Sequence, residues 1–131
     1  AMIHTTKTSH MAEDYFANGG LTEGELITRI CFEIPSKGTY LKHTRASSTD
    51  AVVGVLVSRF EERCRVAIVG SQRVAFLCPA LEAALGKRFH QDVYERSHIP
   101  DDMFSHRDDA SLDYQLNLVE VLCKKAIKDC A

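Results

Sequence analysis

Residues 112–127 read LDYQLNLVEVLCKKAI, and this stretch carries the clearest structural signal in the chain. From about Asp109 onward, apolar residues recur every three or four positions, which is the period of one face of an α-helix. These residues are Leu112, Leu116, Val119, Leu122, Cys123, Ala126 and Ile127. Asp108 and Asp109 at the start, and Lys124, Lys125 and Lys128 near the end, complement the helix dipole. We therefore predict a long C-terminal helix with one buried face.

Shorter helices are predicted upstream of this stretch. Residues 79–86 place proline in a first helical turn and glycine just after the end, which is typical of a short helix. A second short helix is predicted over residues 90–97, before Pro100. Residues 11–17 favour one helical turn, which Asn18, Gly19 and Gly20 end because glycine tolerates a positive φ.

The middle of the chain has the composition of β-strands. Residues 25–34, 37–45, 50–60 and 63–70 are rich in β-branched and aromatic residues and are separated by short polar or proline-containing segments. Such short connections favour antiparallel neighbours, since a parallel crossover needs a dozen or more residues. Residues 1–10 are polar and are expected to be irregular, with Ala1 outside the fold. We predict an α+β fold in which an antiparallel sheet of three to four strands is packed against a layer of about three helices.

Composition restricts the class of protein. A chain of 131 residues suits one domain with a single core. Its formal net charge of −2 provides no large positive field for a phosphate backbone, so nucleic acid is not an expected partner. No apolar run approaches the ~20 residues of a membrane span, and the first residues lack the pattern of a secretory signal. The expected location is the cytoplasm.

Recognisable catalytic and metal-binding motifs are absent from the sequence. Five cysteines, Cys31, Cys64, Cys78, Cys123 and Cys130, form no C-x-x-C pair, and the first four lie in apolar stretches typical of reduced core residues. Six scattered histidines, His4, His10, His43, His90, His98 and His106, lack metal-ligand spacing and are interpreted as exposed or capping residues. The adjacent pairs Asp101/Asp102 and Asp108/Asp109 are interpreted as solvated turn and cap residues. We predict no catalytic and no metal-binding residue, with a thiol- or metal-dependent enzyme as a minor alternative.

One polar run stands out, because Lys42-His-Thr-Arg45 lies at the end of a predicted strand. A basic side chain at a strand end can face an anionic ligand or a reduced cofactor. An ordinary solvated strand end explains the same residues, so the pattern by itself indicates no more than a small α+β domain.

Several segments, in order along nearly the whole chain, resemble one family. They are residues 12–16, 21–27 and 33–35, then 40–45 and 50–54, the strand 65–70, the helix 80–86, and finally 99–102, 110–114, 121–122 and 125–127. Together they resemble the FAD-binding (medium) subunit of molybdenum hydroxylases, the family of the carbon monoxide dehydrogenase flavoprotein and of xanthine dehydrogenase. By this resemblance, residues 1–35 correspond to the end of the FAD-binding domain and residues 36–131 to the C-terminal domain.

The resemblance implies a function in electron transfer between iron–sulfur clusters and an oxidant through FAD. Three positions match residues at the flavin edge: Asp14, Ile27 and Lys42, whose ammonium would stabilise negative charge on a reduced flavin. The glycine-rich loops that hold the FAD pyrophosphate in the family do not occur here, so FAD is expected only together with an upstream domain. Gln115 stands where the family usually has arginine, and Tyr15 where it has phenylalanine.

Two functional hypotheses follow. In the first, the chain is the C-terminal domain of an FAD-dependent oxidoreductase subunit, inactive alone, which lines the flavin edge and packs against iron–sulfur and molybdenum subunits. In the second, it is a stand-alone homo-oligomeric interaction module that has lost the flavin. The presence or absence of a ligand-sized cleft beside Lys42 and Ile27 separates the two.

Overall fold

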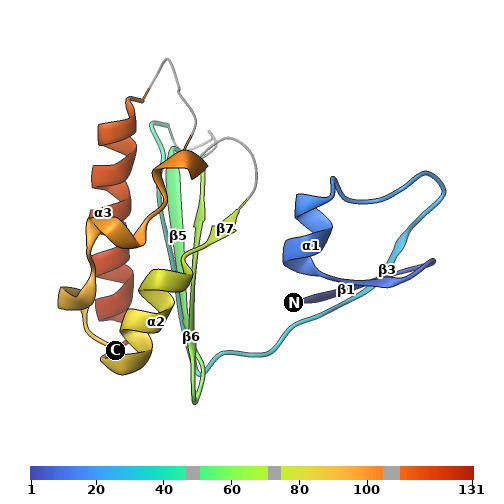
Figure 1. The fold of residues 1–131 in the computed structure, drawn as a ribbon, viewed down its shortest axis with the longest axis horizontal. Helices are drawn as coiled ribbons and strands as arrows, with labels where there is room; N and C mark the ends of the chain where they lie inside the picture. Colours follow the sequence, from blue (N-terminus) through green and yellow to red (C-terminus); the bar gives the residue numbers. More distant parts are fainter. Residues whose placement is uncertain (47–50, 71–74, 105–109) are drawn as a thin grey trace. The chain divides into compact units, whose positions relative to one another are not determined.

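The computed structural model describes residues 1–46, 51–70, 75–104 and 110–131, and it divides into two compact units, Ala1–Ile34 and Pro35–Ala131 (Figure 1). The first unit contains a three-stranded antiparallel sheet, the second a four-stranded antiparallel sheet with helices. The α+β class predicted from the sequence is confirmed. The assignment of residues 1–35 and 36–131 to two family domains stays a prediction.

The first unit is built on short strands that the sequence analysis missed. β1 (Met2–Thr5) pairs with β2 (Ser9–Met11) on one side and with β3 (Ile27–Cys31) on the other, and α1 (Ala12–Ala17) follows β2. The expectation that residues 1–10 are irregular was therefore wrong. Ile3 is the reason, since it is buried at 4% exposure between two pairing strands. Strands of three and four residues are too short to show an alternating pattern.

A buried carboxylate holds the turn that leads into β3. Glu25 accepts hydrogen bonds from the hydroxyl of Thr5, from the backbone N–H of Thr22 (3.0 Å) and from the hydroxyl of Thr22 (2.7 Å). These bonds, the one from Thr5 first, lower the pKa of Glu25 from 4.5 to about 2, and the nearby Lys7 ammonium contributes to the shift. Glu25 therefore joins β1 to the turn at Thr22, and these bonds favour its charged form.

The second unit contains a four-stranded antiparallel sheet, as predicted, but one of its four strands differs from the prediction. Its order is β4 (Lys37–His43), β5 (Val53–Arg59), β6 (Cys64–Val69) and β7 (Phe76–Leu77), and every neighbouring pair is antiparallel. The sequence analysis took the strand at residues 25–34 as the first of four consecutive neighbours. That was wrong, because β3 pairs with β1 in the other sheet. The two-residue β7 occupies the fourth place instead.

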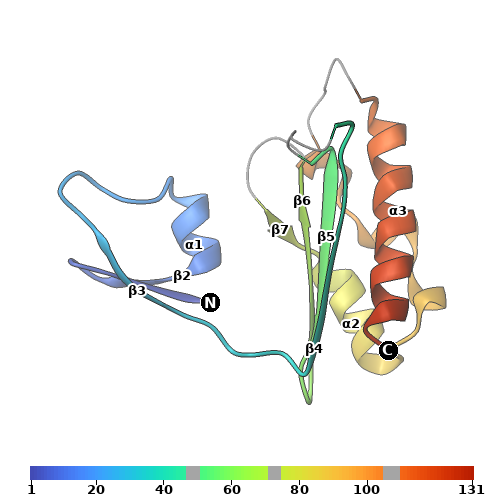
Figure 2. The same ribbon diagram turned by 180° about the vertical axis from the view of Figure 1, so that it is seen from behind.

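Helices cover one face of the four-stranded sheet (Figures 1 and 2). α2 (Pro79–Lys87) contacts β6, and α3 (Leu112–Asp129) contacts β4 and β5. Between them the chain forms three 3₁₀ turns, η1 (Gln91–Val93), η2 (Arg96–His98) and η3 (Asp101–Met103). The continuous helix predicted over residues 90–97 was wrong. His90 and His98 each accept a backbone N–H, from Asp92 and Glu95, and so cap two separate turns.

The core of the second unit lies between the sheet and its helices. Alternate residues of β5 and β6, including Val55, Val57, Val66 and Ile68, are fully buried there, as are Val119, Ala126 and Ile127 of α3. The buried face predicted for the C-terminal helix is thereby confirmed. The helix begins at Leu112, where the Ser111 hydroxyl accepts the N–H of Tyr114 at 3.3 Å. Asp108 and Asp109 lie outside the described residues.

Candidate functional site

Lys42 lies on the face of the four-stranded sheet opposite the helices. In the register of the sheet it pairs with Gly54 of β5, which in turn pairs with Val69 of β6. Side chains two residues apart on a strand share a face, so Tyr40 lies beside Lys42 on this surface. Both side chains are exposed, Tyr40 at 51%. We call this surface, made by Tyr40, Lys42, Gly54, Leu56, Ala67, Val69 and Leu77, the open sheet face.

Gly54 gives this face its shape. A Cβ at Gly54 would lie 2.5 Å from Oη of Tyr40 and 2.6 Å from Cγ2 of Val69. The Tyr40 ring therefore lies across β5 in the space left by the missing side chain. The next row, Tyr40, Leu56, Ala67 and Leu77, is apolar across four strands. The result is a largely apolar surface with one exposed ammonium at Lys42.

Tyr40 is the feature that the sequence analysis did not assign, although it stands in the quoted segment 40–45. The spacing of two residues between Tyr40 and Lys42 could have shown that both side chains lie on the same face of a strand. What the sequence does not show is that Gly54 pairs opposite Lys42, because strand register depends on turn geometry as well as on pattern.

The polar run at residues 42–45 divides between the two faces of the sheet. His43 faces the helices, and its ring stands edge-on to Tyr114 of α3, with centroids 6.3 Å apart and Nε2 3.2 Å from the Tyr114 Oη. This contact fixes the end of β4 against the start of α3. Of residues 42 and 43, only Lys42 is thus available on the open sheet face.

The other two predicted site residues belong to the first unit. Asp14 lies in the first turn of α1 and is exposed, and Ile27 begins β3, pairs with Thr5 and is 42% exposed. They come from different elements of that unit, whereas Lys42 belongs to the second unit. A common flavin site formed by Asp14, Ile27 and Lys42 stays a prediction.

The cysteines are all free thiols, and four of them are buried. Burial raises the pKa of Cys78 to about 12 and also raises the pKa values of Cys64 and Cys123, which keeps these thiols protonated and weakly nucleophilic. Cys31 is the exception to the predicted core placement, since it is exposed at the end of β3. The reason is that the first unit has little interior in which a side chain can be buried.

Histidines and acidic pairs form no metal centre in the ranges that the structure describes. His4 is bonded to the Ser9 hydroxyl at 2.7 Å, and Asp101 forms an ion pair with Arg96 at 2.6 Å. His106 lies outside the described residues. Within the same ranges, no helix is both long and apolar enough to cross a membrane.

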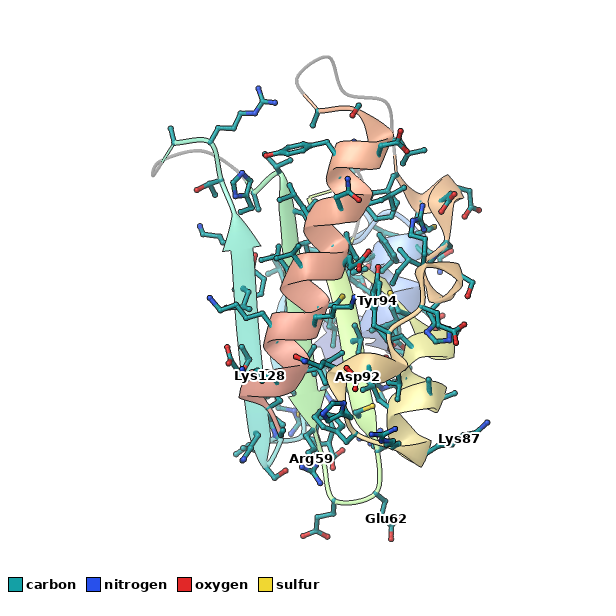
Figure 3. The ribbon with its side chains drawn as sticks, turned by 90° about the vertical axis from the view of Figure 1, so that its left-hand side faces the viewer. Arg59, Glu62, Lys87, Asp92, Tyr94 and Lys128 are labelled. Carbon is teal, nitrogen blue, oxygen red and sulfur yellow. The ribbon has the colours of Figure 1, made fainter. Side chains whose placement is uncertain are left out.

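A hollow of about 220 Å³ lies at the turn between β5 and β6, next to the end of α2. Arg59 lies over the Phe89 ring at 4.8 Å and Arg63 over the Phe60 ring at 4.7 Å, so two guanidinium groups border it. In Figure 3, Arg59 and Glu62 lie at this hairpin end, and Lys87 extends away from α2. None of the three predicted site residues lines the hollow.

Comparisons with known proteins give a similarity of fold. No family model matches the chain, and no curated protein does. Among solved structures, the chain is similar to the crystal structure of quinoline 2-oxidoreductase from Pseudomonas putida 86, with a TM-score of 0.72 and 16% sequence identity. The match covers 98% of this chain and 51% of that chain. The chain thus has the fold of about half of an oxidoreductase chain.

Proposed function

We propose that this chain forms the C-terminal half of the flavin-binding subunit of an oxidoreductase of the molybdenum hydroxylase type. The observation that carries the proposal is the fold similarity, which extends over 98% of the chain and pairs it with half of a chain from an enzyme of that family. The sequence segments described above point to the same family independently of the fold. Iron–sulfur and molybdenum subunits are the partners that this function requires.

The residues of the open sheet face suit the edge of a flavin. When bound, FAD supplies a carrier for one or two electrons, and its reduced ring carries negative charge. Lys42 provides a positive charge that favours this reduced form, and Tyr40 provides an aromatic surface beside it. The assignment of Asp14 and Ile27 to the flavin edge rests on the family resemblance of their sequence segments. The pyrophosphate is held elsewhere, since the chain lacks the glycine-rich loops for it.

The test uses the natural assembly. The chain is tagged in its natural source, the complex that contains it is isolated, and its flavin, iron and molybdenum contents are measured. We expect all three in fixed proportion to the chain. A complex without flavin would contradict the proposal.

A first prediction concerns Lys42 in that complex. Lys42→Ala should lower the midpoint potential of the flavin by roughly 20–40 mV, which corresponds to losing about 1–2 kcal/mol of charge stabilisation in a two-electron couple. Lys42→Arg keeps the charge and should keep most of the potential. The measurement is a spectroscopic redox titration. Lys87→Ala, which removes an exposed lysine from α2, is the control and should leave the potential unchanged.

A further inference from the structure

One face of the first unit's sheet brings sulfur and imidazole groups together. In the register of the three strands, His4 of β1 pairs with Ser9 of β2 and with Arg29 of β3. Met2 of β1 pairs with Cys31 of β3, and the register between the two pairs has no bulge. Side chains two residues apart on a strand share a face, so Met2 and Cys31 lie on the same face as His4. Cys31 is exposed there, while Met2 and His4 are half-buried.

His4 is held in the tautomer that can bind a metal ion through Nε2. Its Nδ1 lies 2.7 Å from Oγ of Ser9, and its Nε2 lies 3.4 Å from Nη2 of Arg29. A guanidinium group only donates hydrogen bonds, so Nε2 is the acceptor and Nδ1 carries the proton that it donates to Ser9. The Nε2 lone pair therefore points toward β3, the strand that carries Cys31. A hydrogen bond that fixes the tautomer in this way is typical of metal-binding histidines.

The side chains of Met2, His4 and Cys31 are close enough for one metal ion to bridge them. Cβ atoms of residues directly opposite each other in an antiparallel pair are about 4.5–5.5 Å apart, and diagonal neighbours are about 7–8 Å apart or somewhat less. Met2 is directly opposite Cys31, and His4 is the diagonal neighbour of Cys31. A metal ion about 2–2.3 Å from each ligand atom spans this triangle, because Met2 and His4 have long side chains. Met11, on the other side of Met2, lies two strands away from Cys31 and is outside the triangle.

We propose that Met2, His4 and Cys31 bind one Cu(I) ion through Sδ, Nε2 and Sγ. Thioether, imidazole and thiolate groups are ligands that suit Cu(I), whereas Zn(II) is bound by thiolate, imidazole and carboxylate groups. On binding, the thiol of Cys31 releases its proton to the solvent and an S–Cu bond forms, with no change in oxidation state. The proposal does not depend on the proposed function, since it uses only residues of the first unit and no flavin.

Charge favours a monovalent ion at this place. One thiolate neutralises Cu(I), but the same three ligands would leave a divalent ion with a net positive charge. The guanidinium of Arg29, which contacts the His4 ring, would repel that charge. The charge of the ligand set and the charge beside it therefore both favour Cu(I).

The experiment is a titration of the purified 131-residue chain with Cu(I). Under anaerobic conditions and with ascorbate as the reductant, the chain competes for Cu(I) with a coloured chelator. The absorbance of the chelator complex gives the affinity and the stoichiometry. We expect one Cu(I) ion per chain. One Cu(I) ion shared by two chains would overturn the proposal.

Substitution of each ligand tests the site. Cys31→Ser, Met2→Leu and His4→Gln should each weaken binding by about tenfold or more. Ser9→Ala, which removes the acceptor for the Nδ1 proton, should weaken it by about tenfold. Met103→Leu, which removes a 42% exposed methionine from the second unit, is the matched control and should leave the affinity unchanged. Weaker binding in Cys31→Ser alone would indicate a simple exposed thiol and would overturn the proposal.

Alkylation of Cys31 gives a second readout that needs no variant. Cys31 is the one exposed cysteine of the five, so mass spectrometry can follow its reaction with iodoacetamide separately. One equivalent of Cu(I) should slow this reaction by about tenfold or more, whereas one equivalent of Zn(II) should change it little. Amide exchange over residues 27–31 shows whether each variant keeps the sheet. Equal rates with and without Cu(I), or equal protection by Zn(II), would overturn the proposal.

Discussion

At the scale of single residues, Glu25 makes the first unit sensitive to acid. Its pKa is about 2 in the folded chain against an ordinary value of 4.5, so its contribution to stability is complete above pH 4.5 and is lost as the pH falls toward 2. Two basic side chains face the same carboxylate: Lys7, whose charge lowers this pKa, and His10, whose Nε2 lies 4.0 Å from it.

We therefore expect faster amide exchange of residues 22–26 as the pH falls from 4.5 to 2, after correction for intrinsic exchange. Glu25→Gln should show fast exchange already at neutral pH and no such pH dependence. Glu23→Gln, which changes an exposed neighbour, is the control and should behave as the unchanged chain. If the unchanged chain shows constant protection down to pH 2, the role assigned to Glu25 is wrong.

Gly54 is a second single residue with a measurable effect. Gly54→Ala places a Cβ 2.5 Å from the Tyr40 Oη and should cost about 1–3 kcal/mol of unfolding free energy, since either Tyr40 or the strand must move. Gly86→Ala is the matched control, because its Cβ would meet nothing within 4 Å in a helix, where alanine gains up to about 1 kcal/mol. Denaturant unfolding of both variants measures the difference. A Gly54→Ala variant as stable as the unchanged chain would show that Tyr40 does not occupy this space.

At the scale of elements, α3 depends on its first turn. Ser111→Ala removes the acceptor for the Tyr114 N–H and should destabilise the second unit by about 1 kcal/mol. Ser111→Asp retains an acceptor and adds a favourable charge at the helix start, so it should be close to neutral. Thermal unfolding followed by circular dichroism compares the two. An equal loss of stability in both variants would mean that the Ser111 cap does not stabilise the start of α3.

The elements also show which parts of the fold the sequence could predict. α3 and α2 were predicted because their patterns are long or bounded by proline and glycine, as at Pro79 and Gly86. β5 and β6 were predicted because their alternating valines and isoleucines mark a buried face. β1, β2 and β7 were missed because two to four residues are too few for a period to appear. The composition of β3 could not show to which sheet it belongs, since the β1 residues that pair with it lie 22 to 29 positions earlier in the chain, from Thr5↔Ile27 to Met2↔Cys31.

At the scale of the whole molecule, the difference between the two units explains the remaining errors. The second unit has a core, and the prediction of buried cysteines is confirmed there for Cys64, Cys78 and Cys123. The first unit has almost none, so the apolar neighbours of Cys31 did not indicate burial. Of the candidate site, Lys42 could be chosen from the sequence, whereas the arrangement around it required the register of β4 and β5.

The C-terminal end of α3 lies beside the start of β4 in the second unit. Lys37, at the start of β4, donates a hydrogen bond to the carbonyl of Ala131, and the Cys130 thiol lies 3.2 Å from the Thr39 hydroxyl oxygen. The points where the chain enters and leaves this unit are therefore neighbours in space. A unit with adjacent ends can be inserted into a surface loop of another protein through short linkers and without stretching its host. The contact between Lys37 and Ala131 therefore makes residues 35–131 geometrically suited to insertion as well as to end-to-end fusion.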